Sequence, residues 1–145
     1  MPIAYAIAFL ASLLCSAALA EVHEVKMLNR GASGAMVYEP EFLAIAPGDR
    51  VRFIATQPSH NAASLPGFLP DGAAPFKGRI NEEIEVRFDT PGFYGIQCIP
   101  HLSMGMVMLI QVGERPISEL QIPVSLPTRA RQRFEQIVEQ ANSAY

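Results

Sequence analysis

Three side chains that bind soft metal ions lie within nine residues of one another. Cys98, His101 and Met106 follow the spacing Cys-x-x-His-x-x-x-x-Met. A short loop with this spacing can direct a thiolate, an imidazole and a thioether to one point. His60 lies well before this loop in the chain and offers a second imidazole. These four residues are the part of the sequence best suited to chemistry.

Two imidazoles, one thiolate and one weak thioether favour copper over other metals. Thiolate and thioether suit Cu(I), imidazole suits Cu(II), and a trigonal His₂Cys site with a distant methionine is typical of blue-copper electron carriers. Structural zinc would use several thiolates or four strong donors. The pattern therefore predicts a redox copper site. The spacing alone leaves Met104, Met106 and Met108 as candidates for the thioether.

Each donor has a simpler interpretation when it is taken alone. A histidine in a Pro/Ser/Asn loop, such as His60, is more often not a ligand, and an isolated Cys98 would be a buried structural thiol. Their occurrence together favours the metal site. His23 has no neighbouring donor in its alternating segment and is interpreted as an ordinary surface histidine.

Residues 1–20 predict a secretory signal peptide. They carry no charged side chain, are rich in apolar residues, and end in the small-x-small pattern Ala-Leu-Ala. The run is short for a bilayer span and no basic cluster follows it, so a transmembrane anchor is the weaker alternative. Because Cys15 lies in this segment, Cys98 would be the only exported thiol. We expect a single periplasmic domain over residues 21–145.

The composition excludes several classes of protein. The chain has 145 residues, of which 50% are hydrophobic and 17% charged, so it fits one folded domain and not a disordered tail. The formal net charge of -3 provides no broad positive field for phosphate groups. We therefore expect no nucleic-acid partner.

Short segments with alternating or β-branched character predict strands before residue 113. They are residues 22–27, 42–45, 51–54, 84–88, 93–98 and 106–112, separated by turns that contain Gly or Pro. Many short strands at such spacing are typical of an all-β sandwich. Farther on, residues 118–120 predict a short helix, and Phe134, Ile137, Val138 and Ala141 predict an amphipathic helix that packs on the sandwich.

These features together resemble the cupredoxins, the type 1 blue-copper family, and within it the pseudoazurin branch. The resemblance runs over nearly all of the chain after residue 20, including residues 27–32, 34–40 and 98–112 and the helical tail. The Cys-x-x-His-x-x-x-x-Met loop is shared with plastocyanin, which lacks the C-terminal helices. The resemblance implies a Greek-key β-sandwich of about eight strands with two C-terminal α-helices.

The resemblance also implies one copper ion bound by His60, Cys98, His101 and an axial Met106. Four protein ligands leave no open position for a substrate, so we expect an electron carrier and not an enzyme. Storage or delivery of copper is the alternative function. It is less favoured because a copper chaperone would more often expose a Met-rich or Cys-x-x-Cys site.

Residues around these ligands take supporting roles by the same resemblance. Asn61 would link the His60 loop to the Cys98 loop and direct a backbone N–H at the sulfur. Pro100 has no N–H to offer there, and Met36 would pack near the His101 ring. Electrons would pass through the edge of that ring. The surrounding docking patch would consist of Ala35, Ile99, Pro100, Leu102, Met104 and Gly105.

The family shuttles single electrons in the bacterial periplasm, so the expected partners are copper nitrite reductase and c-type cytochromes. We expect a monomer that makes brief contacts with them. Lysines usually surround the docking patch, but only Lys26 and Lys77 occur in this chain, and Pro58 and Gln97 stand where lysine would be expected.

Overall fold

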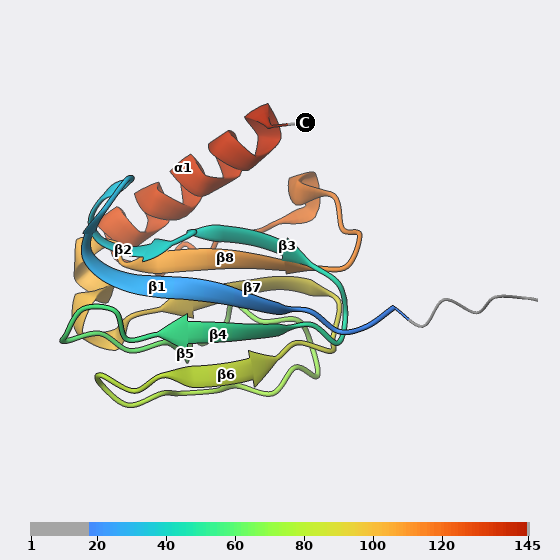
Figure 1. Ribbon diagram of the computed structural model, residues 1–145. Coiled ribbons are helices and arrows are strands. Elements are labelled where there is room, and N and C mark those ends of the chain that lie inside the picture. Colours follow the sequence, from blue (N-terminus) through green and yellow to red (C-terminus); the bar gives the residue numbers. More distant parts are fainter. Residues whose placement is uncertain (1–17, 145) are drawn as a thin grey trace, which may run out of the picture.

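The chain forms two four-stranded sheets that pack face to face, with a helix on the outer side of one of them (Figure 1). The computed structural model describes residues 18–144. Most of the predicted signal peptide, residues 1–17, and with it Cys15, lies outside the described residues. Within the described part of the chain, no helix is long and apolar enough to span a membrane.

The first sheet has the strand order β2-β1-β4-β6. Its strands are β1 (Val22–Gly31), β2 (Gly34–Glu39), β4 (Arg50–Ile54) and β6 (Ile84–Arg87). A tight turn joins β1 to the antiparallel β2, whereas β1 and β4 run parallel and β4 pairs with β6 in antiparallel fashion. Because β1 and β4 are parallel, their C-terminal ends lie at the same end of the sandwich.

The second sheet has the order β3-β8-β7-β5. It consists of β3 (Phe42–Ile45), β8 (Val107–Val112), β7 (Gly92–Gln97) and the two-residue β5 (Ala63–Ser64). β3 and β8 are parallel, and β7 is antiparallel to both β8 and β5. The connections that pass from one sheet to the other confirm the predicted all-β sandwich.

Alternation along the strands builds the core between the sheets. Successive strand residues point to opposite faces, so Val25 and Met27 of β1 and Val51 and Phe53 of β4 are all fully buried on one face. The other sheet contributes inward side chains such as Met108, which belongs to the same cluster. Burial of each such side chain stabilises the fold by about 1.5–3 kcal/mol.

The opposite face of the second sheet is covered by α1 (Thr128–Ser143), which packs against β8 and lies obliquely above the sandwich in Figure 1. Val107 and Leu109 of β8 face this helix and pack with its fully buried Phe134. The rings of Phe68 and Phe134 lie with centroids 4.9 Å apart. The predicted apolar face is confirmed, because Phe134 and Ile137 are buried on it.

Three sequence expectations differ from the structure. Residues 34–39 form β2 and residues 63–64 form β5, which the alternation did not identify as strands. The expected pair of C-terminal α-helices is reduced to one, because the first is only a 3₁₀-helix at Ile117–Glu119. Pro116, Pro123 and Pro127 explain this, since proline removes a backbone donor and restricts the residue before it.

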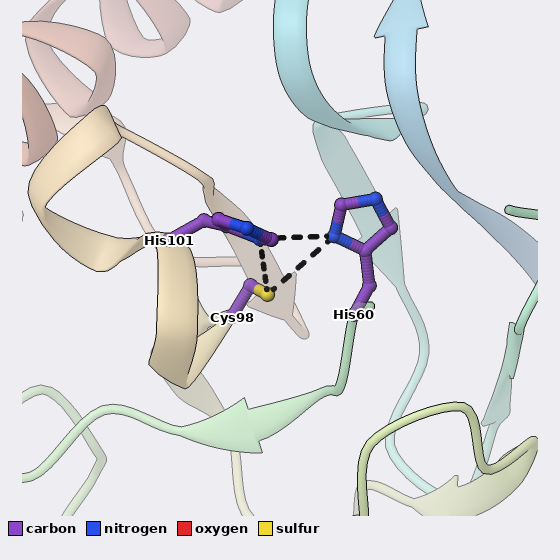
Figure 2. Close-up of side chains that lie close together, drawn as sticks. All are labelled: His60, Cys98 and His101. Atoms are coloured by element: carbon purple, nitrogen blue, oxygen red, sulfur yellow. Dashed lines mark hydrogen bonds between the residues drawn. The ribbon is translucent and has the colours of Figure 1, made fainter. Parts of the chain in front are cut away.

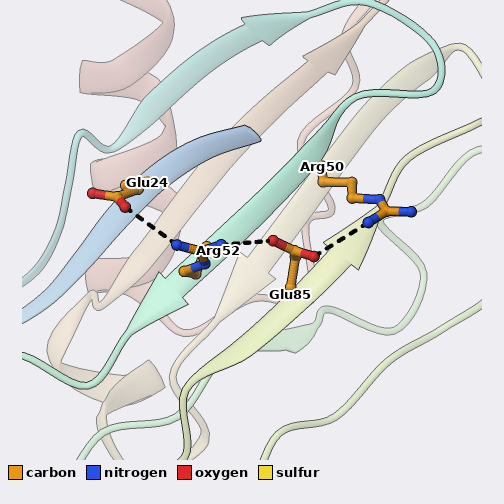
Figure 3. A network of polar contacts seen from close by, with 4 residues as sticks. All are labelled: Glu24, Arg50, Arg52 and Glu85. Atoms are coloured by element: carbon orange, nitrogen blue, oxygen red, sulfur yellow. Dashed lines mark hydrogen bonds and ion pairs between the residues drawn. The ribbon is translucent and has the colours of Figure 1, made fainter. Parts of the chain in front are cut away.

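Charged side chains of three strands form a network on the exposed face of the first sheet (Figure 3). Arg52 lies 3.5 Å from Glu24 and 3.2 Å from Glu85, and Arg50 lies 3.4 Å from the other oxygen of Glu85. Such solvent-exposed pairs contribute little to stability. Their main effect is that both arginines are already paired with carboxylates.

Removing the Phe134 ring tests how strongly α1 is held. We expect Phe134→Ala to lower the free energy of unfolding by about 3–5 kcal/mol, because it removes a fully buried ring and leaves a cavity. Urea denaturation followed by circular dichroism measures this change. The control is Gln132→Ala on the exposed side of the same helix, for which we expect about 0.5 kcal/mol or less. Equal effects of the two substitutions would refute the predicted role of this face.

Candidate metal centre

His60, Cys98 and His101 converge at one end of the sandwich (Figure 2). His60 lies in the connection after β4, Cys98 follows β7, and His101 lies in the 3₁₀-helix η1 (Ile99–Met104). The His60 and His101 Nδ1 atoms are 3.1 Å apart. The Cys98 Sγ atom lies 3.8 Å from the first of these nitrogens and 3.5 Å from the second.

The spacing of these three atoms fits a bound metal ion. A point equally distant from them lies about 2.0 Å from each, close to usual metal–imidazole distances of about 2.0–2.1 Å and a few tenths of an ångström below a metal–thiolate distance of about 2.3 Å. The donor types, two imidazoles and one thiolate, are those of a trigonal copper site. The residues present therefore fit the copper ion that the sequence predicts.

Met106 is the methionine that the structure places beside these ligands. It is fully buried, accepts a hydrogen bond from the Cys98 N–H at 3.1 Å, and donates its own N–H to the His101 carbonyl at 3.2 Å. Met104 is 43% exposed, and Met108 lies in the core between the sheets. The backbone thus favours Met106 over the other two methionines of the loop.

A hydrogen bond fixes the tautomer of the buried His60 ring. Its Nε2 atom lies 2.8 Å from the Asn29 Oδ1 atom, which accepts the Nε2–H proton. The Gln57 side chain in turn accepts the Asn29 backbone N–H at 2.5 Å. Burial and the nearby His101 lower the pKa of His60. The ring therefore stays neutral and directs the lone pair of Nδ1 into the site.

The environment of Cys98 is compatible with a bound metal ion. The thiol is fully buried, and burial raises its pKa, although backbone hydrogen bonds from Asn61 and His101 act in the opposite direction. A thiolate in such surroundings is stabilised by a bound metal, and metal binding releases the thiol proton. The N–H of Asn61 toward this residue agrees with the expected role of Asn61.

The buried side chain of Asn61 connects three segments. Its Oδ1 atom accepts the Ile99 N–H at 2.8 Å, and its Nδ2 atom donates to the Gly78 carbonyl at 3.0 Å. The Tyr38 hydroxyl donates to the Asn61 carbonyl at 2.7 Å, and burial holds the pKa of Tyr38 well above its usual value. The phenol thus remains a donor, and Asn61 joins the loop of His60 to that of Cys98.

Two residues of this scaffold have no role in the sequence interpretation. Asn29 orients His60, and Tyr38 orients Asn61, yet both lie in segments that the sequence analysis used only for the family resemblance. Another contact holds the backbone of the same loop, because Asn81 donates its N–H to the His60 carbonyl at 2.8 Å. These bonds join residues far apart in the sequence, so no local pattern reveals them.

The surface above the ligands is apolar, as expected, but smaller than predicted. Ala35, Ile99, Pro100 and Met104 are exposed and Leu102 is half-buried, with its side chain against the cluster under α1. Gly105 is buried, which corrects its assignment to the docking patch. A Cβ atom on this glycine would lie 3.0 Å from the Arg129 carbonyl oxygen, so the start of α1 covers it.

Exposure differs among the four expected ligands. His60, Cys98 and Met106 are fully buried, whereas His101 is only half-buried. Pro100 lies beside it at the start of η1. Met36 packs, half-buried, against the core cluster that contains Cys98 and Met106. The ring of His101 is therefore the ligand that reaches the surface.

Comparison with known proteins agrees with this site. Residues 25–113 match the family described as copper binding proteins, plastocyanin/azurin family. Pseudoazurin from Paracoccus pantotrophus is 44% identical over 135 residues, which cover 91% of this chain and 93% of that protein.

Solved structures give the same result. A pseudoazurin from Sinorhizobium meliloti superposes with a TM-score of 0.80 and 40% identity, covering 86% of this chain and 99% of the other. Pseudoazurin from Methylobacterium extorquens AM1 has a TM-score of 0.74 and 34% identity, with coverages of 83% and 98%.

Replacing Asn61 tests the connection between the two ligand loops. We expect Asn61→Ala to lower the free energy of unfolding by about 2–4 kcal/mol, because it leaves the Gly78 carbonyl and the Ile99 N–H without partners. Urea denaturation of the metal-free protein measures the change. Gln57→Ala is the matched control, since its side chain accepts only the exposed Asn29 N–H, which water can satisfy instead, at a cost of about 1 kcal/mol or less. Equal losses would contradict the assigned role of Asn61.

Proposed function

This chain belongs to the plastocyanin/azurin family of copper binding proteins, within which it is a pseudoazurin, and from this premise we propose that it carries single electrons between redox proteins of the bacterial periplasm. Pseudoazurins are blue-copper electron carriers and not enzymes. The observation that carries the proposal is the convergence of two imidazoles and one thiolate, of which only His101 reaches the surface.

His60, Cys98, His101 and Met106 are the proposed ligands. Copper, when bound there, supplies a one-electron couple between Cu(I) and Cu(II). The chain provides soft sulfur donors for the reduced ion and imidazoles for the oxidised ion. The bonds from Asn29 and Asn61 hold these donors in position, so little movement should accompany the gain or loss of an electron.

The route to a partner follows from exposure. His101 is half-buried and shares η1 with the exposed apolar residues Ile99, Pro100 and Met104. A partner that covers this surface would exclude water and approach the imidazole edge closely. Since only a few apolar side chains are available, the contact should be small and short-lived, as a shuttle requires.

A copper nitrite reductase is the proposed acceptor, with c-type cytochromes as further partners. Periplasmic export rests on the predicted signal peptide, residues 1–20, with cleavage after Ala20. We propose that the exported chain acts as a monomer. Storage or delivery of copper is less well supported, because three of the four donors are fully buried, whereas a delivery site has to expose its ligands to the receiver.

Replacing the thiolate tests the redox copper site. With one equivalent of Cu(II), the protein from residue 21 onward should show an intense visible band that a reductant bleaches and an oxidant restores. We expect Cys98→Ser to abolish the band, because the thiolate–copper bond gives rise to it. Glu85→Gln, on the distant sheet face, is the control and should keep it. Copper binding without the band in the unaltered protein would favour storage or delivery instead.

The salt dependence of electron transfer tests how a partner is recognised. Only two lysines are present, and Pro58 and Gln97 stand where lysine would be expected beside the docking patch. We therefore expect the rate of electron transfer to copper nitrite reductase to fall less than about tenfold between low salt and about 0.5 M NaCl. Stopped-flow measurement of copper reoxidation gives this rate.

Met104→Lys is the matched variant for this test. It adds one positive charge to the docking surface and should make the salt dependence steeper. A loss of rate of about a hundredfold or more in the unaltered protein would contradict weak electrostatic steering.

A further inference from the structure

A second group of potential metal ligands lies at the opposite end of β1 from the copper site. Glu21, His23 and Asp49 have side-chain donor atoms within 4.8 Å of one another. In Figure 1 the start of β1 lies at the far end of the sandwich from η1. The His23 Nε2 atom lies 2.9 Å from Asp49 Oδ2 and 3.9 Å from Glu21 Oε2.

The buried carboxylate of Asp49 accepts hydrogen bonds from the first residues of the domain. Its Oδ1 atom accepts the Glu21 backbone N–H at 3.0 Å, and its Oδ2 atom accepts the Ala46 N–H at 3.1 Å as well as the His23 proton. The carboxylate therefore holds the Glu21 nitrogen and the His23 ring next to each other.

The contact with Asp49 also selects the tautomer of His23. An ionised carboxylate accepts hydrogen bonds only, so Nε2 has to be the protonated nitrogen. In the neutral ring the lone pair then lies on Nδ1, the nitrogen closer to the residue's own backbone. His23 is thus prepared to bind a metal through Nδ1, in the same way as His60.

The sequence supplies the remaining donors. Cleavage after Ala20 makes Glu21 the first residue and His23 the third. The α-amine, the amide nitrogens of Val22 and His23, and the His23 Nδ1 atom can then form three adjoining chelate rings around one ion. Four nitrogens in a plane are the donor set that Cu(II) and Ni(II) favour.

We propose that the processed N-terminus, Glu21-Val22-His23, is a second metal site that binds one Cu(II) or Ni(II) ion. This inference rests on cleavage after Ala20, which the proposed function includes, but it does not depend on electron transfer. Its donors are all nitrogen, so it selects the oxidised copper ion, whereas the site with Cys98 also accommodates Cu(I).

Binding requires a limited local change. Successive amides of a strand point to opposite sides, so Val22 and His23 have to turn their nitrogens into one plane. This change breaks the first pairings of β1 with β4, which join Val22 to Arg50 and His23 to Val51, but it leaves β2 in place, because β2 pairs with β1 only from Lys26 onward. The ammonium group and two amides each release a proton to solvent, so the affinity should rise with pH.

Nickel titration of copper-loaded protein tests the proposal. Because copper already fills the site with Cys98, added Ni(II) reports on the N-terminal site. Calorimetry and the absorption of square-planar Ni(II) measure its binding. Protein that begins at Glu21, verified by intact mass, should bind one equivalent. Two variants should bind at least about tenfold more weakly: a chain that keeps Ala20, which makes His23 the fourth residue, and His23→Gln. The blue absorption band should be unchanged in all three proteins.

Two results would overturn the proposal. The first is equal nickel affinity of the three proteins, or no binding by the protein that begins at Glu21. The second is binding that survives the extra Ala20 but is lost in His23→Gln, since this would assign the ion to side chains without the amine. The mass of protein exported from the full gene tests the premise separately, because a first residue other than Glu21 removes the site while leaving the electron carrier intact.

Discussion

The arrangement of the metal centre depends on one buried amide, the side chain of Asn61. One of its hydrogen bonds joins the segment before β5, which carries His60, to the loop after β7, which carries Cys98, and the other joins the same segment to Gly78 before β6. This connection lies closer to the ligands than the pairing of β5 with β7, which joins the same two segments. A buried amide that lacks one partner is costly, so both loops are held in a single relative position. The metal-binding distances follow from this position.

The sandwich places the parts that Asn61 then fixes. The parallel pairing of β1 and β4 brings Asn29 and the connection that carries His60 to the same end of the first sheet. In the second sheet, β7 and β8 flank the loop with the remaining ligands, and α1 packs on β8 and against Gly105. Core packing and helix docking therefore act on the site indirectly, by limiting where its loops can begin and end.

The sequence predicted those parts of the site that depend on neighbours in the chain. Cys98 and His101 share one loop with several methionines, so their spacing alone indicated that they bind a common metal ion. The choice of Met106 among the methionines needed the family resemblance. The contribution of Asn29 to His60 and of Tyr38 to Asn61 arises from long-range contacts that leave no periodic pattern. The short β5 is held by pairing with β7 and not by its own alternation. Gly105 was misplaced because its burial depends on α1, which lies more than twenty residues away in the chain.

Three of the four proposed ligands belong to one continuous connection between adjacent antiparallel strands. Mutations that arise in evolution can therefore change this connection without changing the strands on either side of it. Insertions, deletions or exchanges between β7 and β8 would change the angles around the metal and the surface over His101 while leaving both sheets paired. Strand pairing and the geometry around the metal therefore depend on largely separate stretches of the chain. Natural variants can therefore differ in reduction potential and in partner while they keep the same fold.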